Sequence, residues 1–380
     1  MATEKSMSDE DRALLLETVR ALVAAKIAPN AKVIDEDSRI SSEMFRSLAD
    51  AGINAATVPE IFGGGGASVL DGAMLIEEVA KGSGAVASIL SMNLAGVEAV
   101  AASANGHLKY DLLPKVSGGE RVLVWSADPV GSRGGVIASA ATGGTLLNGS
   151  LHWVPCYDSG ADLVVLVDAV VDSQRQLLAV DVSKPSGGRV EIGPLESDLG
   201  LRGASLRLLV FHDVLVSTGQ IVAAGASGVA AAEKFYSAAR VALASQANGI
   251  AVSALYHATN YAAERSQFGV PIMDFESTRT ILGTMALNIE AARKLTFAAA
   301  EQIDVGGQSY ERFPLDLGAK WLATKVAVEA AIDAVQVHGG YGFVKDYPVE
   351  RLMRDAKMTQ LMLGTGQILA IADALANADY

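Results

Sequence analysis

The spacing of apolar residues changes twice along this 380-residue chain, and the change limits the folds that the chain can adopt. From about residue 228 onward, apolar residues recur with the period of an α-helix. The pattern predicts long helices over 229–266, 275–303 and 315–338, and a fourth helix from about residue 364 to the end. Long alanine-rich helices with short connections are typical of a bundle. We therefore predict a C-terminal four-helix-bundle domain over residues 225–380.

The middle of the chain, residues 120–224, has the composition of β-strands. Short runs of β-branched and apolar residues alternate there with Gly, Asp, Ser and Asn, which favours antiparallel strands joined by turns. The runs cover 122–125, 137–140, 163–167, 177–182 and 206–211. We therefore expect an antiparallel, β-barrel-like middle domain.

Residues 1–119 are predicted to form an N-terminal helical domain. Ser8, followed three residues later by Asp11, forms a capping box before a stretch with helical spacing. The glycines from Gly63 to Gly66 must lie in a loop, because glycine loses more backbone entropy in a helix than any other residue. Helical patterns resume at about residues 70 and 86. The fold class is thus mostly α with a central β module.

Charge and composition exclude several classes of partner. The net charge of −13 and the lack of a Lys/Arg cluster argue against nucleic acid or an anionic membrane as a partner. Apolar runs such as 94–104 are shorter than the ~20 residues of a membrane-spanning helix, and the charged N-terminus does not read as a signal peptide. Cys156 is the only cysteine, so no intrachain disulfide can form and a cytoplasmic location is expected. The five histidines lack metal-ligand spacing, so no metal site is predicted.

Two motifs in the last third of the chain carry most of the functional information. The first, E-R-S-Q-F-G-V-P-I, covers residues 264–272, and the second begins with Q-V-H-G-G-Y-G at residue 336. The second motif continues through P-V-E-R and R-D-A-K to G-T-G-Q-I, which starts at residue 364. This combination resembles the C-terminal signature of the acyl-CoA dehydrogenase family, and the order of the three predicted domains is also the layout of that family.

The resemblance implies an FAD cofactor that lies between two subunits. One subunit holds the flavin ring, and its neighbour holds the adenine and pyrophosphate end. The residues that match the second role are Arg265, Phe268, Gln336, Gly339 and Gly340. A guanidinium can donate paired hydrogen bonds to pyrophosphate oxygens, and glycines let the backbone approach a bulky ligand closely.

The flavin-ring role is matched less completely. The matching residues are Ser126, Trp153, Thr365 and Gln367 for the cofactor and Ser132 for the thioester ligand. A threonine that faces the flavin in the family is Ala127 here, and a second threonine, which donates a hydrogen bond to the flavin, is Pro155. Neither replacement has a hydroxyl, and proline also lacks a backbone N–H, so both contacts are lost.

The resemblance also points to a missing catalytic group. In the family, the residue just before Gly-Thr of the last motif is usually the glutamate that removes the α-proton of the acyl thioester, and here it is Leu363. A minority of the family carries the base on the long helix, immediately before an arginine. Arg240 matches that arginine and is assigned to substrate binding, but the preceding residue is Ala239. Because neither leucine nor alanine can accept a proton, no catalytic residue is assigned.

Three explanations remain open at this point. The chain could be a non-catalytic subunit of a hetero-oligomeric acyl-CoA dehydrogenase, or a family member with altered chemistry, such as a desulfinase, a reductase or a flavin oxygenase. The third explanation is a relocated base, with Glu276 or with Glu78 on an exposed-looking helix, although a structural or solvated role is the simpler interpretation of each. The expected activity is α,β-dehydrogenation of an acyl thioester or a related flavin reaction.

The resemblance implies partners as well. The ligand is expected to be an acyl-CoA or acyl-carrier thioester, and an electron-transfer flavoprotein is the candidate electron acceptor. The assembly is expected to be a homo- or hetero-oligomer organised as a dimer of dimers.

Overall fold

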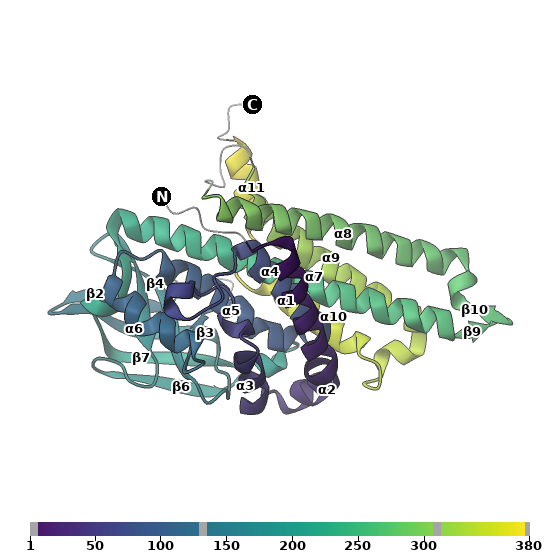
Figure 1. Cartoon of the computed structure of the whole chain (residues 1–380), viewed down its shortest axis with the longest axis horizontal. Coiled ribbons are helices and arrows are strands. Elements are labelled where there is room, and N and C mark those ends of the chain that lie inside the picture. Colours follow the sequence, from purple (N-terminus) through teal and green to yellow (C-terminus); the bar gives the residue numbers. More distant parts are fainter. Residues whose placement is uncertain (1–6, 129–134, 307–312, 377–380) are drawn as a thin grey trace.

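The computed structural model describes residues 7–128, 135–306 and 313–376. In Figure 1 the strands of the middle of the chain lie at one end of the molecule, and long helices extend to the other end. The predicted order of helices, strands and helices is confirmed. The N-terminal elements are α1 (Asp9–Leu22), the π-helical turn η1 (Val23–Ile27), α2 (Ala28–Asp37), α3 (Ser42–Asp50), the 3-10 turns η2 (Ile53–Ala55) and η3 (Glu60–Phe62), α4 (Val69–Gly82), α5 (Gly84–Ala101) and α6 (Gly106–Ser117).

Local sequence signals set the start of several helices. At the start of α1 the Ser8 hydroxyl accepts a hydrogen bond from the Asp11 backbone N–H at 3.1 Å, which is one of the two bonds of the predicted capping box. Ser68 and Asp71 form a complete capping box at the start of α4. The glycine-rich segment before α4 is a loop, in which Gly63 and Gly66 adopt positive φ angles of 84° and 60°. Residues with a Cβ rarely adopt that conformation, so the loop depends on glycine there.

Helix α5 is a core helix of the N-terminal half. It is long and apolar enough to cross a membrane by length and composition, but 89% of it is buried inside the protein. It contacts α4, α7 and β1, so its apolar surface is covered by other parts of the same chain.

The middle of the chain forms two four-stranded sheets that contact each other through β2 and β4 and through β1 and β3. The first sheet has the order β1 (Arg121–Trp125), β4 (Asp162–Val171), β5 (Gln174–Asp181) and β8 (Ile221–Ala224). The second has the order β2 (Val136–Ala141), β3 (Gly144–Pro155), β7 (Leu206–Ser217) and β6 (Arg189–Leu195).

The expectation of purely antiparallel pairing is wrong for one pair of strands. β1 and β4 run parallel, with Arg121 opposite Asp162. Between them the chain passes through β2 and β3 of the other sheet, and such a long crossover is what parallel pairing requires. The composition of a strand does not reveal the direction of its neighbour, so the sequence pattern could not show this.

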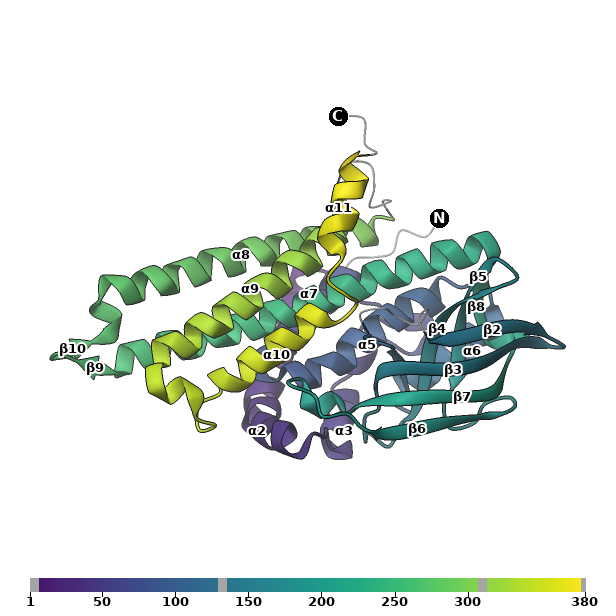
Figure 2. The same ribbon diagram turned by 180° about the vertical axis from the view of Figure 1, so that it is seen from behind.

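Four helices form the C-terminal bundle: α7 (Gly225–Glu264), α8 (Glu276–Asp304), α9 (Leu315–His338) and α10 (Val349–Leu361). The short strands β9 (Ser266–Gln267) and β10 (Val270–Pro271) connect α7 to α8 at the bundle tip, and the 3-10 segment η8 (Gly339–Phe343) follows α9. Figure 2 shows α7, α8 and α9 side by side, with α10 beside them.

The predicted position of the fourth bundle helix is wrong. Helix α10 fills that place by packing on α7 and α9, whereas α11 (Gln367–Ala376) projects from the body in both views. Charged residues are frequent in α10, so its sequence does not indicate a bundle helix. Val349, Leu352 and Ala356 are nevertheless buried.

The R-D-A-K motif joins the bundle to the other two parts of the chain. Arg354 donates two hydrogen bonds to the carboxylate of Asp35 on α2, at 2.9 and 2.7 Å. The next residue, Asp355, accepts a hydrogen bond from the backbone N–H of Leu201 at 2.6 Å. Gly200 packs directly on the Arg354 backbone, where a Cβ would clash. The motif therefore sets how the bundle meets the N-terminal helices and the strands.

Candidate functional site

An open groove of about 510 Å³ lies at the tip of the bundle, where α7 and α9 end. We call it the bundle-tip groove. Both sequence motifs contribute to its lining, with Arg265 and Gln267 from the first and His338, Gly339, Gly340 and Tyr341 from the second. The fold thus brings together three of the five residues that the resemblance assigned to the adenine and pyrophosphate end: Arg265, Gly339 and Gly340.

Arg265 supplies positive charge to this groove. Its side chain is exposed, its guanidinium lies 5.8 Å from the centre of the Tyr341 ring, and it forms no ion pair with any carboxylate in the described part of the chain. A Cβ added to Gly339 or Gly340 would meet no atom within 4 Å, so both glycines border open space. A bulky anion could therefore approach the backbone here while the guanidinium donates hydrogen bonds to it.

Stacked aromatic rings form one wall of the groove. His338 stacks on Tyr261 with ring centres 4.3 Å apart, and it meets Tyr347 edge-on at 5.4 Å. Burial lowers the pKa of His338, although its bond with the Ala334 carbonyl at 2.8 Å opposes the shift. The imidazole is therefore neutral near pH 7. Only 3% of the His338 surface is exposed, so its ring backs Tyr261 in this wall and offers no free face of its own.

The other two residues predicted at this end do not line the groove of a single chain. Gln336 is exposed on the last turn of α9. Phe268 lies between β9 and β10 with 95% of its surface exposed and a positive φ of 53°. The ring of Phe268 is therefore free to contact another molecule.

A second cluster surrounds the turn between α10 and α11, residues 361–364, which we call the Leu363 turn. Leu363 and Gly364 adopt positive φ angles of 55° and 77°. The Leu363 N–H donates to the Ala127 carbonyl at 3.1 Å, and the Ala127 N–H donates to the Trp153 carbonyl at 3.0 Å. Backbone hydrogen bonds thus connect three segments that the resemblance assigned to the flavin ring.

The remaining residues assigned to the flavin ring lie in the same region. The Ser126 hydroxyl donates to the His152 carbonyl at 2.7 Å, and the Gln367 amide donates to the carbonyls of Leu363 and Gly364 at 3.1 and 3.0 Å. The side chains of Ser126 and Gln367 therefore support the local backbone, while Thr365 is exposed beside the turn. Ser132 lies outside the described residues.

Neither of the positions that the resemblance assigned to the base carries a proton acceptor. Leu363 is half-buried against the core, and Ala239 is completely buried in α7. On α7, close to Ala239 in the sequence, Arg240 and Ser237 donate hydrogen bonds to the buried carboxylate of Asp316 at 2.7 and 2.8 Å. That carboxylate is therefore engaged by two donors within the protein.

Comparisons with known proteins decide the family. The family model "Acyl-CoA dehydrogenase, N-terminal domain" matches residues 9–120, and "Acyl-CoA dehydrogenase, C-terminal domain" matches residues 226–375. An acyl-CoA dehydrogenase of Bacillus subtilis is 32% identical to this chain, over 94% of this chain and 96% of its own length. The chain belongs to the acyl-CoA dehydrogenase family. The resemblance drawn from the motifs is thus confirmed.

Two further relatives show the range of the acyl-CoA dehydrogenase family. The structure of butyryl-CoA dehydrogenase from Megasphaera elsdenii superimposes with a TM-score of 0.88 at 27% identity and covers 99% of this chain and 100% of its own. The acryloyl-CoA reductase (NADH) of Anaerotignum propionicum is 30% identical, over 94% of this chain and 92% of its own length. Members of the family are FAD flavoproteins that act as acyl-CoA oxidoreductases.

Neither carboxylate considered as a relocated base lies free beside the Leu363 turn of this acyl-CoA dehydrogenase homologue. Glu78 is buried, contrary to the expectation of an exposed helix, and it accepts hydrogen bonds from Lys81 at 2.8 Å and Arg20 at 3.0 Å. Burial opposes ionisation of Glu78, but the bonds from Lys81 and Arg20 outweigh it and lower its pKa. Glu276 is exposed in the first turn of α8, at the tip end of the bundle.

The bundle-tip groove and the Leu363 turn lie at opposite ends of α9. Near its start, Lys320 donates to the Gly364 carbonyl of the turn at 2.7 Å, and at its end His338 lines the groove. From Lys320 to His338 the helix rises about 27 Å, at roughly 1.5 Å per residue. Figure 2 shows the same separation, with α11 near one end of α9 and β9 and β10 near the other. One chain therefore does not form a single continuous site.

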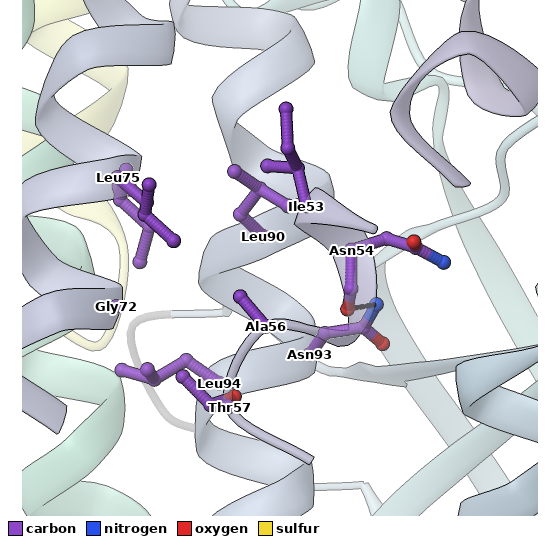
Figure 3. A pocket seen from close by; sticks show the side chains of 10 residues that line it. Ile53, Asn54, Ala56, Thr57, Gly72, Leu75, Leu90, Asn93 and Leu94 are labelled. Atoms are coloured by element: carbon purple, nitrogen blue, oxygen red, sulfur yellow. Dashed lines mark hydrogen bonds between the residues drawn. The ribbon is translucent and has the colours of Figure 1, made fainter. Parts of the chain in front are cut away.

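A small cavity in the N-terminal half belongs to neither cluster. It lies among α4, α5 and η2 and has a volume of about 10 Å³, room for roughly one water molecule. In Figure 3 the side-chain amide of Asn93 donates a hydrogen bond to the backbone carbonyl of Asn54. The Asn54 side chain points away from Asn93. The Asn54 amide has no hydrogen-bond partner in the described part of the chain. The cavity is too small for a ligand of this family.

Two groups of the site were missed in the sequence. His338 lacks metal-ligand spacing, but its place inside the second motif, directly before Gly339, indicates a position in the groove. Lys320 belongs to neither motif. It lies on the apolar face of its predicted helix together with Ala323 and Ala327, and a lysine on such a face is a signal of a buried, paired cation.

Proposed function

We propose that this protein binds FAD at an interface between two subunits and acts on an acyl thioester without the usual glutamate base. The observation that carries the proposal is the bundle-tip groove, where Arg265 and two open glycines meet a stacked aromatic wall. Guanidinium, exposed backbone and flat ring surface are the groups that a pyrophosphate and an adenine would use.

The distance between the two clusters supports an oligomer. The groove and the Leu363 turn are about 27 Å apart along α9, at roughly 1.5 Å per residue, which exceeds the reach of one extended FAD molecule from adenine to ring. If the groove binds the adenine end, the ring must therefore lie beside the Leu363 turn of another chain. The exposed Phe268 at the bundle tip suits such a contact. Whether the other chain is a second copy or a homologue separates the two candidate functions.

Bound FAD would supply hydride transfer between the acyl β-carbon and the flavin ring. Trp153, Thr365 and the backbone of the Leu363 turn would hold the ring, and Arg240 would lie on the substrate side. In this chain no side chain at position 363 or 239 can take the α-proton. In dehydrogenation the α-proton would have to pass to water or to a group other than these two side chains. In the reverse direction, the reduction that the Anaerotignum propionicum relative is named for, the α-carbon would have to gain its proton from such a group.

The second candidate is a non-catalytic subunit, and the pattern of replacements favours it specifically. Leu363, Ala239, Ala127 and Pro155 all lie on the flavin-ring side, while Arg265, Gly339 and Gly340 remain on the adenine side. Such a subunit would complete the adenine end of a site whose ring and glutamate belong to a homologous partner.

Expression of the chain alone, followed by absorbance spectroscopy, tests the proposal. A yellow homo-oligomer that exchanges electrons between acyl-CoA or enoyl-CoA thioesters and a redox dye would support the first candidate. A colourless protein that becomes yellow on co-expression with a glutamate-bearing homologue would support the second. A protein that binds no FAD in either setting would contradict both.

A further inference from the structure

Lys320 is a lysine buried in the bundle with only 1% of its surface exposed. Lysine is almost never fully buried unless its charge has partners. Its ammonium donates to the backbone carbonyls of Gln360 at 2.9 Å and Gly364 at 2.7 Å. No carboxylate pairs with it within the described residues. The charge therefore serves two backbone carbonyls rather than an ion pair.

Those two carbonyls flank the Leu363 turn. Gln360 lies in the last turn of α10, where carbonyls lack partners within the helix and carry the negative end of its dipole. Gly364 follows Leu363, a residue with a Cβ at a positive φ of 55°. Such a conformation persists only when the surroundings hold it. A cation that binds the chain on both sides of Leu363 provides that support.

The surroundings of Lys320 show that its ammonium does more than fill space in the core. Burial and the neighbouring charge of Arg240 lower the pKa of Lys320 to about 8. A methionine of similar length would fill the same space without that desolvation penalty. The contribution that distinguishes lysine here is its bonds to the turn.

We propose that Lys320 is a positioning residue that fixes the Leu363 turn against Ala127 and Trp153 and thereby sets where the flavin ring lies. It acts through the backbone of the turn and does not contact the ring. The consequence for the flavin rests on the proposed function, whereas the effect on the turn does not.

Hydrogen–deuterium exchange of the full chain tests the effect on the turn. In Lys320→Met, backbone amides of residues 361–367 should exchange at least tenfold faster, while amides of α8 and the middle of α9 keep their rates. Lys320→Arg, which retains a charged donor, should restore much of the protection. The matched control is Lys325→Met on the same helix, where the lysine is half-exposed and pairs with Glu329. In this control the amides of residues 361–367 should exchange as in the wild type. Unchanged exchange at 361–367 in Lys320→Met, or faster exchange spread evenly over the whole chain, would overturn the proposal.

Flavin fluorescence tests the effect on the ring, using protein loaded with FAD alone or with its partner subunit. Lys320→Met should raise the fluorescence of the bound flavin severalfold, because the ring is held less firmly, while the dissociation constant for FAD changes less than threefold. A wild type that binds no FAD would remove the proposed function but leave the exchange experiment decisive. An FAD-loaded Lys320→Met protein with wild-type fluorescence would refute the role in setting the ring. If neither Lys320 variant folds, the Lys320→Gln variant, which is uncharged but retains a donor, takes their place in both measurements.

Discussion

The bundle-tip groove and the Leu363 turn lie at the two ends of α9, and they are stabilised in different ways. In the groove, Arg265 and Gly340 face open space, and Phe268 beside it is almost fully exposed. In the turn, backbone groups are bonded by Lys320, Gln367 and the Ala127 backbone. The groove is thus open to solvent, whereas the turn is closed by bonds within the chain itself.

Because the Leu363 turn is held by backbone hydrogen bonds, its shape does not depend on which side chain stands at position 363. Leu363 is held through its N–H and its carbonyl, which any residue other than proline supplies. Its side chain takes no part in these bonds. A change from glutamate to leucine at this position therefore alters the chemistry of the site but leaves the backbone frame intact. In the groove, by contrast, the positive charge comes from the Arg265 side chain, so replacing that residue would remove the charge.

The largest expected effect comes from placing an acid in the turn. If only the base is missing, Leu363→Glu should raise acyl-CoA-dependent reduction of a dye by roughly 100-fold or more, because a positioned base contributes about 10²–10⁴-fold. Leu363→Gln, which has the same shape without a proton acceptor, is the control and should show no gain. A flavin-loaded Leu363→Glu protein that remains inactive would mean that the flavin-ring side has lost more than its base.

The second test compares the pH response of the two regions. The pKa of Lys320 is lowered to about 8 in the folded protein, by burial and then by Arg240. Between about pH 8 and the unfolded value near 10.4, the unfolded state binds more protons, so the free energy of unfolding should rise with pH, by roughly 3 kcal/mol over the whole window. Urea denaturation from pH 7 to pH 10 should show this rise as the difference between the wild type and Lys320→Met. The buried Cys156 thiol, whose pKa burial raises to about 12, opposes the rise equally in both proteins above about pH 8.5. Arg265→Met should keep the rise, because an arginine guanidinium does not titrate in this range.

The third test removes the charge of the groove. Arg265→Gln should weaken FAD binding by roughly 10- to 100-fold, since a charge-assisted hydrogen bond is worth about 1.5–3 kcal/mol. Equilibrium titration of the apoprotein, together with its partner subunit where one is needed, measures the change. Lys294→Gln, an exposed cation on α8 near Glu290, is the control and should bind FAD as the wild type does. Equal affinities for the wild type and Arg265→Gln would show that the groove is not the pyrophosphate site.

The smallest effect is expected at the rim of the groove. Phe268→Ala should weaken FAD binding by roughly fivefold, because an aromatic contact contributes about 0.5–1.5 kcal/mol. The free energy of unfolding of the isolated chain should change by less than about 0.5 kcal/mol, as for other surface substitutions. Leu287→Ala, which is 70% exposed on α8, provides the control. A large loss of stability in Phe268→Ala would indicate that Phe268 supports its own chain rather than a ligand or partner.

Much of the fold follows from local patterns in the sequence. The bounds of α9, Leu315–His338, are those that its helical period predicts, and α7 and α8 differ from prediction by only a few residues. The parallel pairing of β1 and β4 and the place of α10 in the bundle were not predictable in this way. Both depend on which distant segments pack together, and the period of a single segment contains no such information.

The sequence by itself determined the family, through its motifs, and the absence of a proton acceptor at positions 363 and 239. Whether a side chain can accept a proton depends only on which residue it is. Tertiary structure alone decided the rest. It placed Lys320 within hydrogen-bond distance of the Leu363 turn, and it bonded the Ala127 backbone to both Leu363 and Trp153. It also separated the bundle-tip groove from the turn by about 27 Å along α9, at roughly 1.5 Å per residue. Burial and contacts between segments far apart in the sequence arise only when the helices pack, so they could be read only from the folded chain.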